Sequence, residues 1–190
     1  MSQHHIEAGL EALAQTALAS RSLSTSVADL SSRYARVLRA GGTLYFCGNG
    51  GSAADAQHLA AEYVVRYSSN RRALAAVALT TDTSILTAAG NDMGFEEIFA
   101  RQVEALCHRE DLLVLHSTSG RSANLLAAAR MARRMEVPVV AFLGKDGGSL
   151  AAMVDTAVIV PSAETGMIQL IHLALEHLIV ESVERELLRA

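Results

Sequence analysis

The sequence is poor in several residue types, and each scarcity argues against a class of protein. Only two cysteines occur and neither belongs to a Cys-x-x-Cys pair, so we expect reduced thiols rather than a disulfide framework. No run of about 18 uncharged apolar residues is present, which is the length that a transmembrane helix needs. Residues 1–7 also lack the basic flank and apolar core of a secretory signal. We therefore expect a cytoplasmic protein with no membrane partner.

Positive charge is scarce as well. The 16 Lys and Arg residues stand against 20 Asp and Glu, for a formal net charge of -4, and they are scattered along the chain. Nucleic-acid binding normally needs clustered positive charge, so we expect no nucleic-acid partner. Apolar residues, in contrast, make up 51% of the 190 residues, enough for one domain with its own core. We expect a single domain over 1–190, with N-terminal helices at 1–40.

Five short apolar runs follow residue 40 and alternate with segments of helical periodicity. The apolar runs lie at 43–47, 74–79, 112–116, 137–143 and 156–160, and the helical segments at 53–66, 95–107, 122–135 and 165–188. Helical connections between successive strands predict parallel pairing. The sequence therefore predicts an α/β fold in which helices flank a doubly wound, five-stranded parallel sheet over 41–190. We assume the flavodoxin-like strand order 2-1-3-4-5, which places the first and third strands side by side.

A glycine-rich loop at 48–52 joins the first predicted strand to a helix. Glycines let a backbone approach an anion closely, and the N–H groups of a helix N-terminus attract negative charge, so the loop can hold a phosphate. A tight turn capped by Ser52 would explain the same residues. The loop also fits a loose dinucleotide fingerprint, but no acidic residue stands about 20 positions further on and Asp82 comes too late.

A second loop, at 117–122, follows the third predicted strand and again precedes a helix. Hydroxyls are carried by Ser117, Thr118, Ser119 and Ser122. One such residue would serve as an ordinary helix cap, but together they can donate several hydrogen bonds to phosphate oxygens. With the first and third strands adjacent, both loops would open into one crevice at the strand ends.

Two polar pairs interrupt apolar helical segments. His58 and Glu62 are four residues apart, which places both side chains on one helix face. Gln169 and His177, eight residues apart in the last helix, lie on nearly the same side of it. Each pair alone is more often a surface pair or a satisfied core contact, and His172 is interpreted in that way. Together the two imidazoles, the carboxylate and the amide oxygen would suit zinc or another divalent ion.

Five motifs carry a resemblance to a known family. They are Gly48-Asn49-Gly50-Gly51-Ser52-Ala53-Ala54-Asp55-Ala56-Gln57-His58, Thr80-Thr81-Asp82-Thr83-Ser84, Gly90-Asn91-Asp92-x-Gly94-Phe95, Ser117-Thr118-Ser119-Gly120-x-Ser122 and Gly144-Lys145-Asp146-Gly147-Gly148. Between Gly41 and Glu184 the chain thus resembles the sugar isomerase (SIS) domain family, and most closely the phosphoheptose isomerases. The resemblance implies conversion of sedoheptulose 7-phosphate into D-glycero-D-manno-heptose 7-phosphate, towards heptose for lipopolysaccharide and other surface glycans.

The resemblance also implies partners and site residues. It implies a homotetramer whose subunits complete each other's clefts, with the helices at 1–40 used in subunit packing. The sugar phosphate would be held by Asn49, Gly50, Gly51, Ser52, Glu62, Asn91, Asp92, Ser117, Thr118, Ser119, Ser122 and Gln169. One zinc ion per subunit would be bound by His58, Glu62, Gln169 and His177, with Glu62 and His177 catalytic.

Moving a carbonyl from C2 to C1 needs a base, an acid and an electrophile, because a proton leaves one carbon and returns to its neighbour through an enediol. We interpret Glu62 as the base and His177 as the partner acid, with the metal ion and Gln169 polarising the carbonyl. The two side chains could equally exchange these roles.

Two other classes of protein compete with an isomerase. A non-catalytic SIS protein, resembling the DnaA initiator-associating factor, would use the same fold as a protein-binding platform. Its relatives typically lack the acid and the last His, whereas Glu62 and His177 are both present here. A dinucleotide-dependent oxidoreductase would not explain the hydroxyl-rich loop at 117–122. The isomerase is therefore the favoured prediction.

Overall fold

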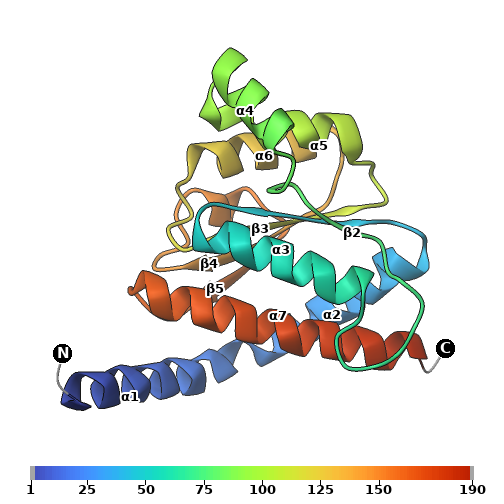
Figure 1. Ribbon diagram of the computed structural model, residues 1–190. Helices are drawn as coiled ribbons and strands as arrows, with labels where there is room; N and C mark the ends of the chain where they lie inside the picture. Colours follow the sequence, from blue (N-terminus) through green and yellow to red (C-terminus); the bar gives the residue numbers. More distant parts are fainter. Residues whose placement is uncertain (1–2, 189–190) are drawn as a thin grey trace.

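The computed structural model describes residues 3–188, which are built around a five-stranded parallel sheet (Figure 1). Its strands are β1 (Leu44–Gly48), β2 (Ala76–Ala78), β3 (Leu112–Ser117), β4 (Val139–Gly144) and β5 (Thr156–Val160). They pair in the order β2-β1-β3-β4-β5, which confirms both the predicted fold class and the assumed strand order. Each predicted apolar run overlaps one of these strands, and β1, β3 and β4 extend one residue beyond their runs.

Helices cover both faces of the sheet. One face carries α2 (Ser24–Arg39), α3 (Gly51–Val64) and α7 (Thr165–Leu188), and the other carries α5 (Ala100–Leu106) and α6 (Ala123–Arg134). Successive strand side chains point to opposite faces, so Phe46 and Val114 join the first hydrophobic cluster, whereas Cys47 and Leu115 join the second. Short 3-10 helices lie at η1 (Ser20–Leu23), η2 (Phe95–Glu97) and η3 (Leu150–Ala152).

The connection between β2 and β3 differs from the prediction. An additional helix, α4 (Thr83–Asp92), begins after Asp82, whose carboxylate accepts a hydrogen bond from the Ile85 N–H at 2.9 Å. Only Ala89 of α4 is buried, so the sequence has no apolar stripe from which this helix could be predicted. The helix predicted over 95–107 is divided into η2 and α5. Capping of α4 thus gives Asp82 a structural role.

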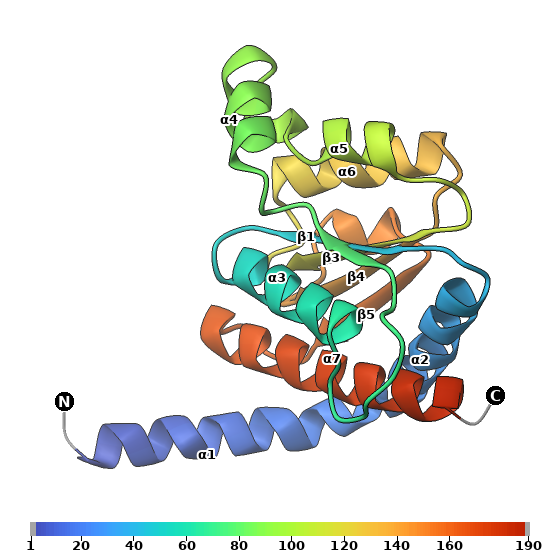
Figure 2. The same ribbon diagram turned by 45° about the vertical axis from the view of Figure 1, so that its right-hand side comes forward.

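The two N-terminal helices behave differently. The first, α1 (Gln3–Ala19), extends away from the body of the protein, and none of its side chains is buried (Figures 1 and 2). The second, α2, buries one face against α7. A groove of about 420 Å³ runs between α7 and the segment from α1 to α2, lined by small and apolar residues that include Val27, Ile171 and Leu178. Apolar surface of this protomer is therefore left open beside a projecting helix.

The last helix deserves comparison with a membrane span. Among residues 3–188, α7 is the one helix that is long and apolar enough to cross a bilayer by length and composition. Its buried apolar side chains, among them Ile168, Ile179 and Val183, belong to the hydrophobic cluster under the sheet. The helix therefore also meets the description of a core helix, and the absence of a membrane partner stays a prediction.

Truncation of Phe46 tests this account of the core. The ring is fully buried between β1 and α3 and stacks on Tyr63 with centroids 5.9 Å apart. We expect Phe46→Ala to lower the free energy of unfolding by about 3–5 kcal/mol, measured by chemical denaturation at fixed protein concentration. Val77→Ala, in the edge strand β2 with 40% of the residue exposed, should cost less than about 1 kcal/mol. Equal losses would contradict the assigned burial.

Candidate functional site

The first predicted phosphate loop forms the turn that leads into the N-terminus of α3. Gly50 caps the helix with φ of 57°, and no side chain caps it. The interpretation of Ser52 as the cap is therefore wrong, since Ser52 lies inside the helix, with its buried hydroxyl 3.4 Å from the Gln169 amide nitrogen. Gly51 allows this approach, because a Cβ at this position would overlap the Gln169 amide. The loop thus brings α3 and α7 into contact where both helices begin.

The second loop presents hydroxyls whose own hydrogens are available. Ser117 Oγ accepts from the Gly120 N–H at 3.1 Å, and Ser119 Oγ accepts from the Arg121 N–H at 3.3 Å. A hydroxyl that accepts in this way can still donate its hydrogen to an anion. Gly120 has φ of 63°, and a Cβ there would overlap the carbonyl oxygen of Gly147. Only glycine therefore lets the loop follow this path.

The two loops open into one cavity, as the strand order predicts. Its volume is about 270 Å³, and it lies at the carboxyl ends of β1 and β3. The lining residues are Asn49, Gly51, Ser52, His116, Ser117, Thr118, Ser119, Ser122, Thr165 and Gln169. Asn49 is held by a reciprocal pair of side-chain hydrogen bonds with Asn124 of α6, at 2.8 and 2.9 Å. A cavity lined by hydroxyls, amides and backbone N–H groups suits a small anionic ligand.

Three of the four predicted metal ligands meet beyond this cavity. The Nε2 atoms of His58 and His177 are 2.9 Å apart, and Glu62 Oε1 lies 3.4 Å from His58 Nε2. All three ligand atoms lie within 4.8 Å of one another. His58 and Glu62 come from α3 and His177 from α7, and the two imidazole rings meet edge to face. The cluster can hold a divalent cation or pass a proton between its members.

The remaining predicted residues lie at two other places. Gln169 precedes His177 by about two helical turns on α7 and turns its amide towards Ser52 and the cavity. Asn91 and Asp92 end α4, where the Asn91 amide donates to the Asp92 carboxylate at 2.7 Å. Figure 1 shows α4 on the opposite side of the sheet from α7. Among the described residues of this single chain, Asn91 and Asp92 do not reach the cavity or the histidines.

A buried polar cluster behind the cavity was not predicted. The Glu176 carboxylate is fully buried, and its Oε1 lies 3.3 Å from both the Tyr34 hydroxyl and His116 Nε2. His172 Nε2 donates to the Leu143 carbonyl oxygen at 2.9 Å, and burial lowers the pKa of His172 to about 3 despite that hydrogen bond. His172 is therefore neutral and bonded within the core. The signal in the sequence is Glu176 itself, a carboxylate among apolar positions of the last helix.

One member of this cluster reaches the cavity. His116 contributes to the lining of the cavity and stacks between Phe46 and Phe142. Its Nδ1 and the second oxygen of Glu176 have no hydrogen-bond partner among the described residues. Buried groups of this kind are normally satisfied by another group or by ordered water, so the cluster has capacity for further hydrogen bonds.

Comparison with known proteins identifies similar chains. A family model described as the SIS domain matches residues 10–144. The phosphoheptose isomerase of Akkermansia muciniphila is 54% identical over 150 residues, which cover 79% of each chain. The phosphoheptose isomerase of Roseiflexus sp. is 47% identical over 182 residues, covering 96% of this chain and 91% of the relative.

A solved structure agrees with these matches. The phosphoheptose isomerase of Neisseria gonorrhoeae superimposes with a TM-score of 0.92 and 40% sequence identity, covering 96% of this chain and 98% of that one. The similarity thus extends over nearly the whole length of both chains.

Substitution of Gly120 tests the geometry of the second loop. We expect Gly120→Ala to weaken binding of inorganic phosphate about tenfold or more, because alanine is strained at this φ and the loop must move away from Gly147. Isothermal titration calorimetry measures the change. Gly166→Ala is the matched control, since a Cβ there meets nothing within 4 Å. Unchanged phosphate affinity in Gly120→Ala would show that the anion binds elsewhere.

Proposed function

Since the chain belongs to the SIS domain family and is an isomerase of heptose phosphates, we propose that its α3–α7 site converts sedoheptulose 7-phosphate into D-glycero-D-manno-heptose 7-phosphate. The observation that carries the proposal is the continuity of the site. A hydroxyl-lined cavity lies where α3 and α7 begin, and an acid–base cluster lies further along the same two helices. The cavity would anchor the phosphate of the substrate, and the acid–base cluster would act on its carbonyl end.

The phosphate of the substrate is assigned to the loops at 48–52 and 117–122. Ser52, Ser119 and the neighbouring hydroxyls donate to its oxygens, and the N-terminus of α3 adds the attraction of its free N–H groups. Binding energy from this remote group holds C1 and C2 against the reacting residues, so it contributes to rate through positioning.

A zinc ion is assigned to His58, Glu62 and His177, with the Gln169 amide oxygen as a further ligand. Two imidazole nitrogens and a carboxylate oxygen are a donor set typical of catalytic zinc, and their mutual spacing fits a shared cation. A bound divalent cation would supply polarisation of the substrate carbonyl. Zinc as the metal, like the participation of Gln169, is part of the proposal.

Proton transfer is assigned to Glu62 and His177. Glu62 takes the proton from one of the two carbons and returns it to the other, while His177 exchanges a proton with the substrate oxygens as the carbonyl moves. Because an atom that is bonded to the ion cannot carry a proton, each side chain would act as metal ligand and as proton carrier in turn. Glu62 lies on α3 and His177 on α7, and His58 lies between them, with its Nε2 within 3.4 Å of Glu62 Oε1 and of His177 Nε2. The meeting of Glu62 and His177 also disfavours the alternative of a non-catalytic protein-binding platform.

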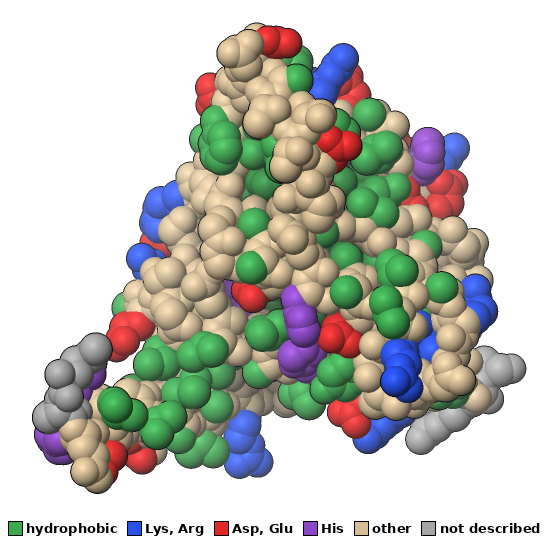
Figure 3. All heavy atoms as spheres, viewed as in Figure 1, with side chains coloured by type: hydrophobic (Ala, Val, Ile, Leu, Met, Phe, Trp, Pro, Cys, Tyr) green, Lys and Arg blue, Asp and Glu red, His purple; other side chains and the backbone are tan. Residues whose placement is uncertain are grey.

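We assign the assembled protein to a homotetramer. Most helical stability in proteins comes from the packing of an apolar face, and α1 has no buried side chain in a single chain. Exposed apolar residues of α1 include Ile6, Leu10 and Leu18, and Figure 3 shows apolar side chains gathered along this helix. A second copy of the chain would cover α1 and the groove beside α7. Asn91 and Asp92 would then complete a neighbouring subunit's cleft.

The cellular setting follows from the thiols and from the substrate. Cys47 and Cys107 are free and buried, and burial raises the pKa of Cys107 to about 12, so both thiols are poorly reactive. Free thiols suit a reducing compartment. We therefore assign the enzyme to the cytoplasm, in the synthesis of heptose for surface glycans, without a nucleic-acid or membrane partner.

Replacement of Glu62 tests the reaction. Wild-type protein incubated with sedoheptulose 7-phosphate should give an aldose product by NMR. We expect Glu62→Gln to lower kcat at least about a hundredfold while substrate binding survives, because an amide cannot accept the carbon-bound proton. Glu110→Gln, at an exposed carboxylate remote from the cavity lining, is the control. Full activity after exhaustive chelation, with no divalent ion by elemental analysis, would remove the metal and leave Glu62 and His177 as a simple acid–base pair.

Light scattering tests the assembly. At micromolar concentration we expect a mass about four times the 20.1 kDa of one chain. Leu10→Asp should shift the protein towards smaller species, because the charge would be buried where α1 meets another copy. A wild-type monomer at this concentration would rule out the proposed assembly.

A further inference from the structure

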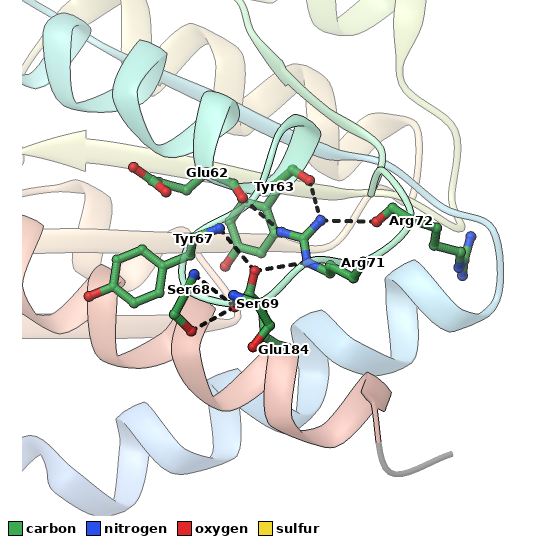
Figure 4. A network of polar contacts seen from close by, with 8 residues as sticks. All are labelled: Glu62, Tyr63, Tyr67, Ser68, Ser69, Arg71, Arg72 and Glu184. Atoms are coloured by element: carbon green, nitrogen blue, oxygen red, sulfur yellow. Dashed lines mark hydrogen bonds and ion pairs between the residues drawn. The ribbon is translucent and has the colours of Figure 1, made fainter.

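The segment that follows α3 is fastened to α7 by a single carboxylate (Figure 4). Glu184 accepts hydrogen bonds from the N–H groups of Tyr67, Ser68 and Ser69 at 2.9 to 3.0 Å, and from the Ser68 hydroxyl at 3.0 Å. Its Oε1 also pairs with Arg71 Nε at 2.9 Å. Both oxygens are thus fully used, and the backbone of 67–69 is held against α7.

Arg71 extends the same contact to the end of α3. Its guanidinium donates to the carbonyl oxygens of Glu62 and Tyr63 at 2.8 Å, and to that of Arg72 at 3.0 Å. The carbonyls of Glu62 and Tyr63 belong to the last turn of α3, where no later N–H group of the helix is available to them. Figure 4 shows the guanidinium lying between Glu184 and this turn. The backbone of Glu62 is therefore tied, through Arg71, to the same carboxylate as the segment 67–69.

The ion pair between Arg71 and Glu184 is buried. The side chains of Arg71 and Glu184 are 4% and 1% exposed, whereas those of Arg185 and Glu181, on the same helix, are 68% and 35% exposed. A buried ion pair is a poor source of net stability, because desolvation offsets its attraction, but it specifies one arrangement of the groups around it. What this pair specifies is the position of the segment that carries Tyr67.

Tyr67 covers the imidazole of His177. The two rings stack with centroids 5.3 Å apart and planes inclined by 24°, and His58 meets His177 edge to face from another direction, at 5.1 Å and 72°. Tyr67 is otherwise 37% exposed, and among the described residues its ring stacks on no other aromatic side chain. A stacked aromatic partner fixes the plane of an imidazole and keeps water from its face.

We propose that Tyr67 is a positioning residue for His177, and that Glu184, through Arg71 and the backbone of 67–69, holds the Tyr67 ring in place. The inference rests on the proposed role of His177 in proton transfer. Tyr67 touches no reacting atom in this assignment. It restricts the His177 ring to the orientation in which Nε2 faces His58 and Glu62.

Two substitutions of Tyr67 separate stacking from the phenol hydroxyl. We expect Tyr67→Ala to lower kcat about tenfold with KM within about twofold, because substrate still binds but the proton-transfer group is loosely oriented. Tyr67→Phe keeps the ring and should restore at least half of the wild-type kcat. Equal kcat in Tyr67→Ala and wild type would overturn the proposal, and so would a loss in Tyr67→Phe as large as in Tyr67→Ala.

A readout without substrate distinguishes this inference from the proposed function. In metal-free protein, NMR of the His177 ring should show one orientation in wild type and Tyr67→Phe, and exchange between orientations in Tyr67→Ala. A single orientation in Tyr67→Ala would overturn the positioning role even if the enzyme is active. An inactive wild-type protein that shows the expected ring behaviour would instead contradict only the proposed reaction.

Glu184→Gln tests whether the Glu184 carboxylate holds Tyr67 in place through Arg71 and the backbone of 67–69. We expect the same fall in kcat and the same ring exchange as in Tyr67→Ala, because an amide cannot accept from Arg71 and all three N–H groups together. Glu181→Gln, which removes an exposed carboxylate of the same helix, should leave both unchanged. Wild-type kcat in a folded Glu184→Gln would overturn the role of Glu184. If this variant does not fold, the Tyr67 pair still decides the role of the ring.

Discussion

The parallel pairing of β1 with β3 is the constraint on which the site depends. The register runs from Leu44 opposite Leu112 to Gly48 opposite His116, so the two strands end at the same edge of the sheet. The loops that leave them must therefore lie side by side, and their hydroxyls and N–H groups face one cavity. The same topology lays α3 and α7 together on one face of the sheet, which brings His58 to His177 across 119 residues of sequence. No local preference of the chain produces that meeting.

Those parts of the fold that depend on local pattern could be predicted from the sequence. Strands buried on both faces appear as short apolar runs, and a helix between two of them leaves parallel pairing as the ordinary solution. The pair His58 and Glu62 was predictable for a similar reason, because four residues are one helical turn. By contrast, α4 buries a single residue, so neither an apolar stripe nor a long run marked it. The alternative of Ser52 as the cap of α3 rested on its being a preferred cap residue, whereas the chain uses Gly50 at a positive φ.

The partners of the buried carboxylates could not be predicted, because these partners lie far away in the sequence. Glu176 finds its partners 60 and 142 residues away, at His116 and Tyr34, and Glu184 finds Arg71 at a separation of 113. Each of these carboxylates is on α7, and each joins that helix to a segment that the sequence does not place beside it. Glu176 links α7 to β3 and α2 behind the cavity. The helix therefore serves as a common frame on which the cavity and the histidines are aligned.

The two outer strands have a consequence for the behaviour of the protein at high concentration. Exposed strand edges can template association with other chains, and short or covered edges reduce that hazard. Here β2 pairs over only three residues, and the β5 edge is approached by Arg33, which donates to the Thr156 hydroxyl at 3.3 Å. Neither edge offers a long uninterrupted row of backbone groups for a foreign strand. The short β2 edge and the side chain that approaches β5 thereby disfavour self-association by sheet extension.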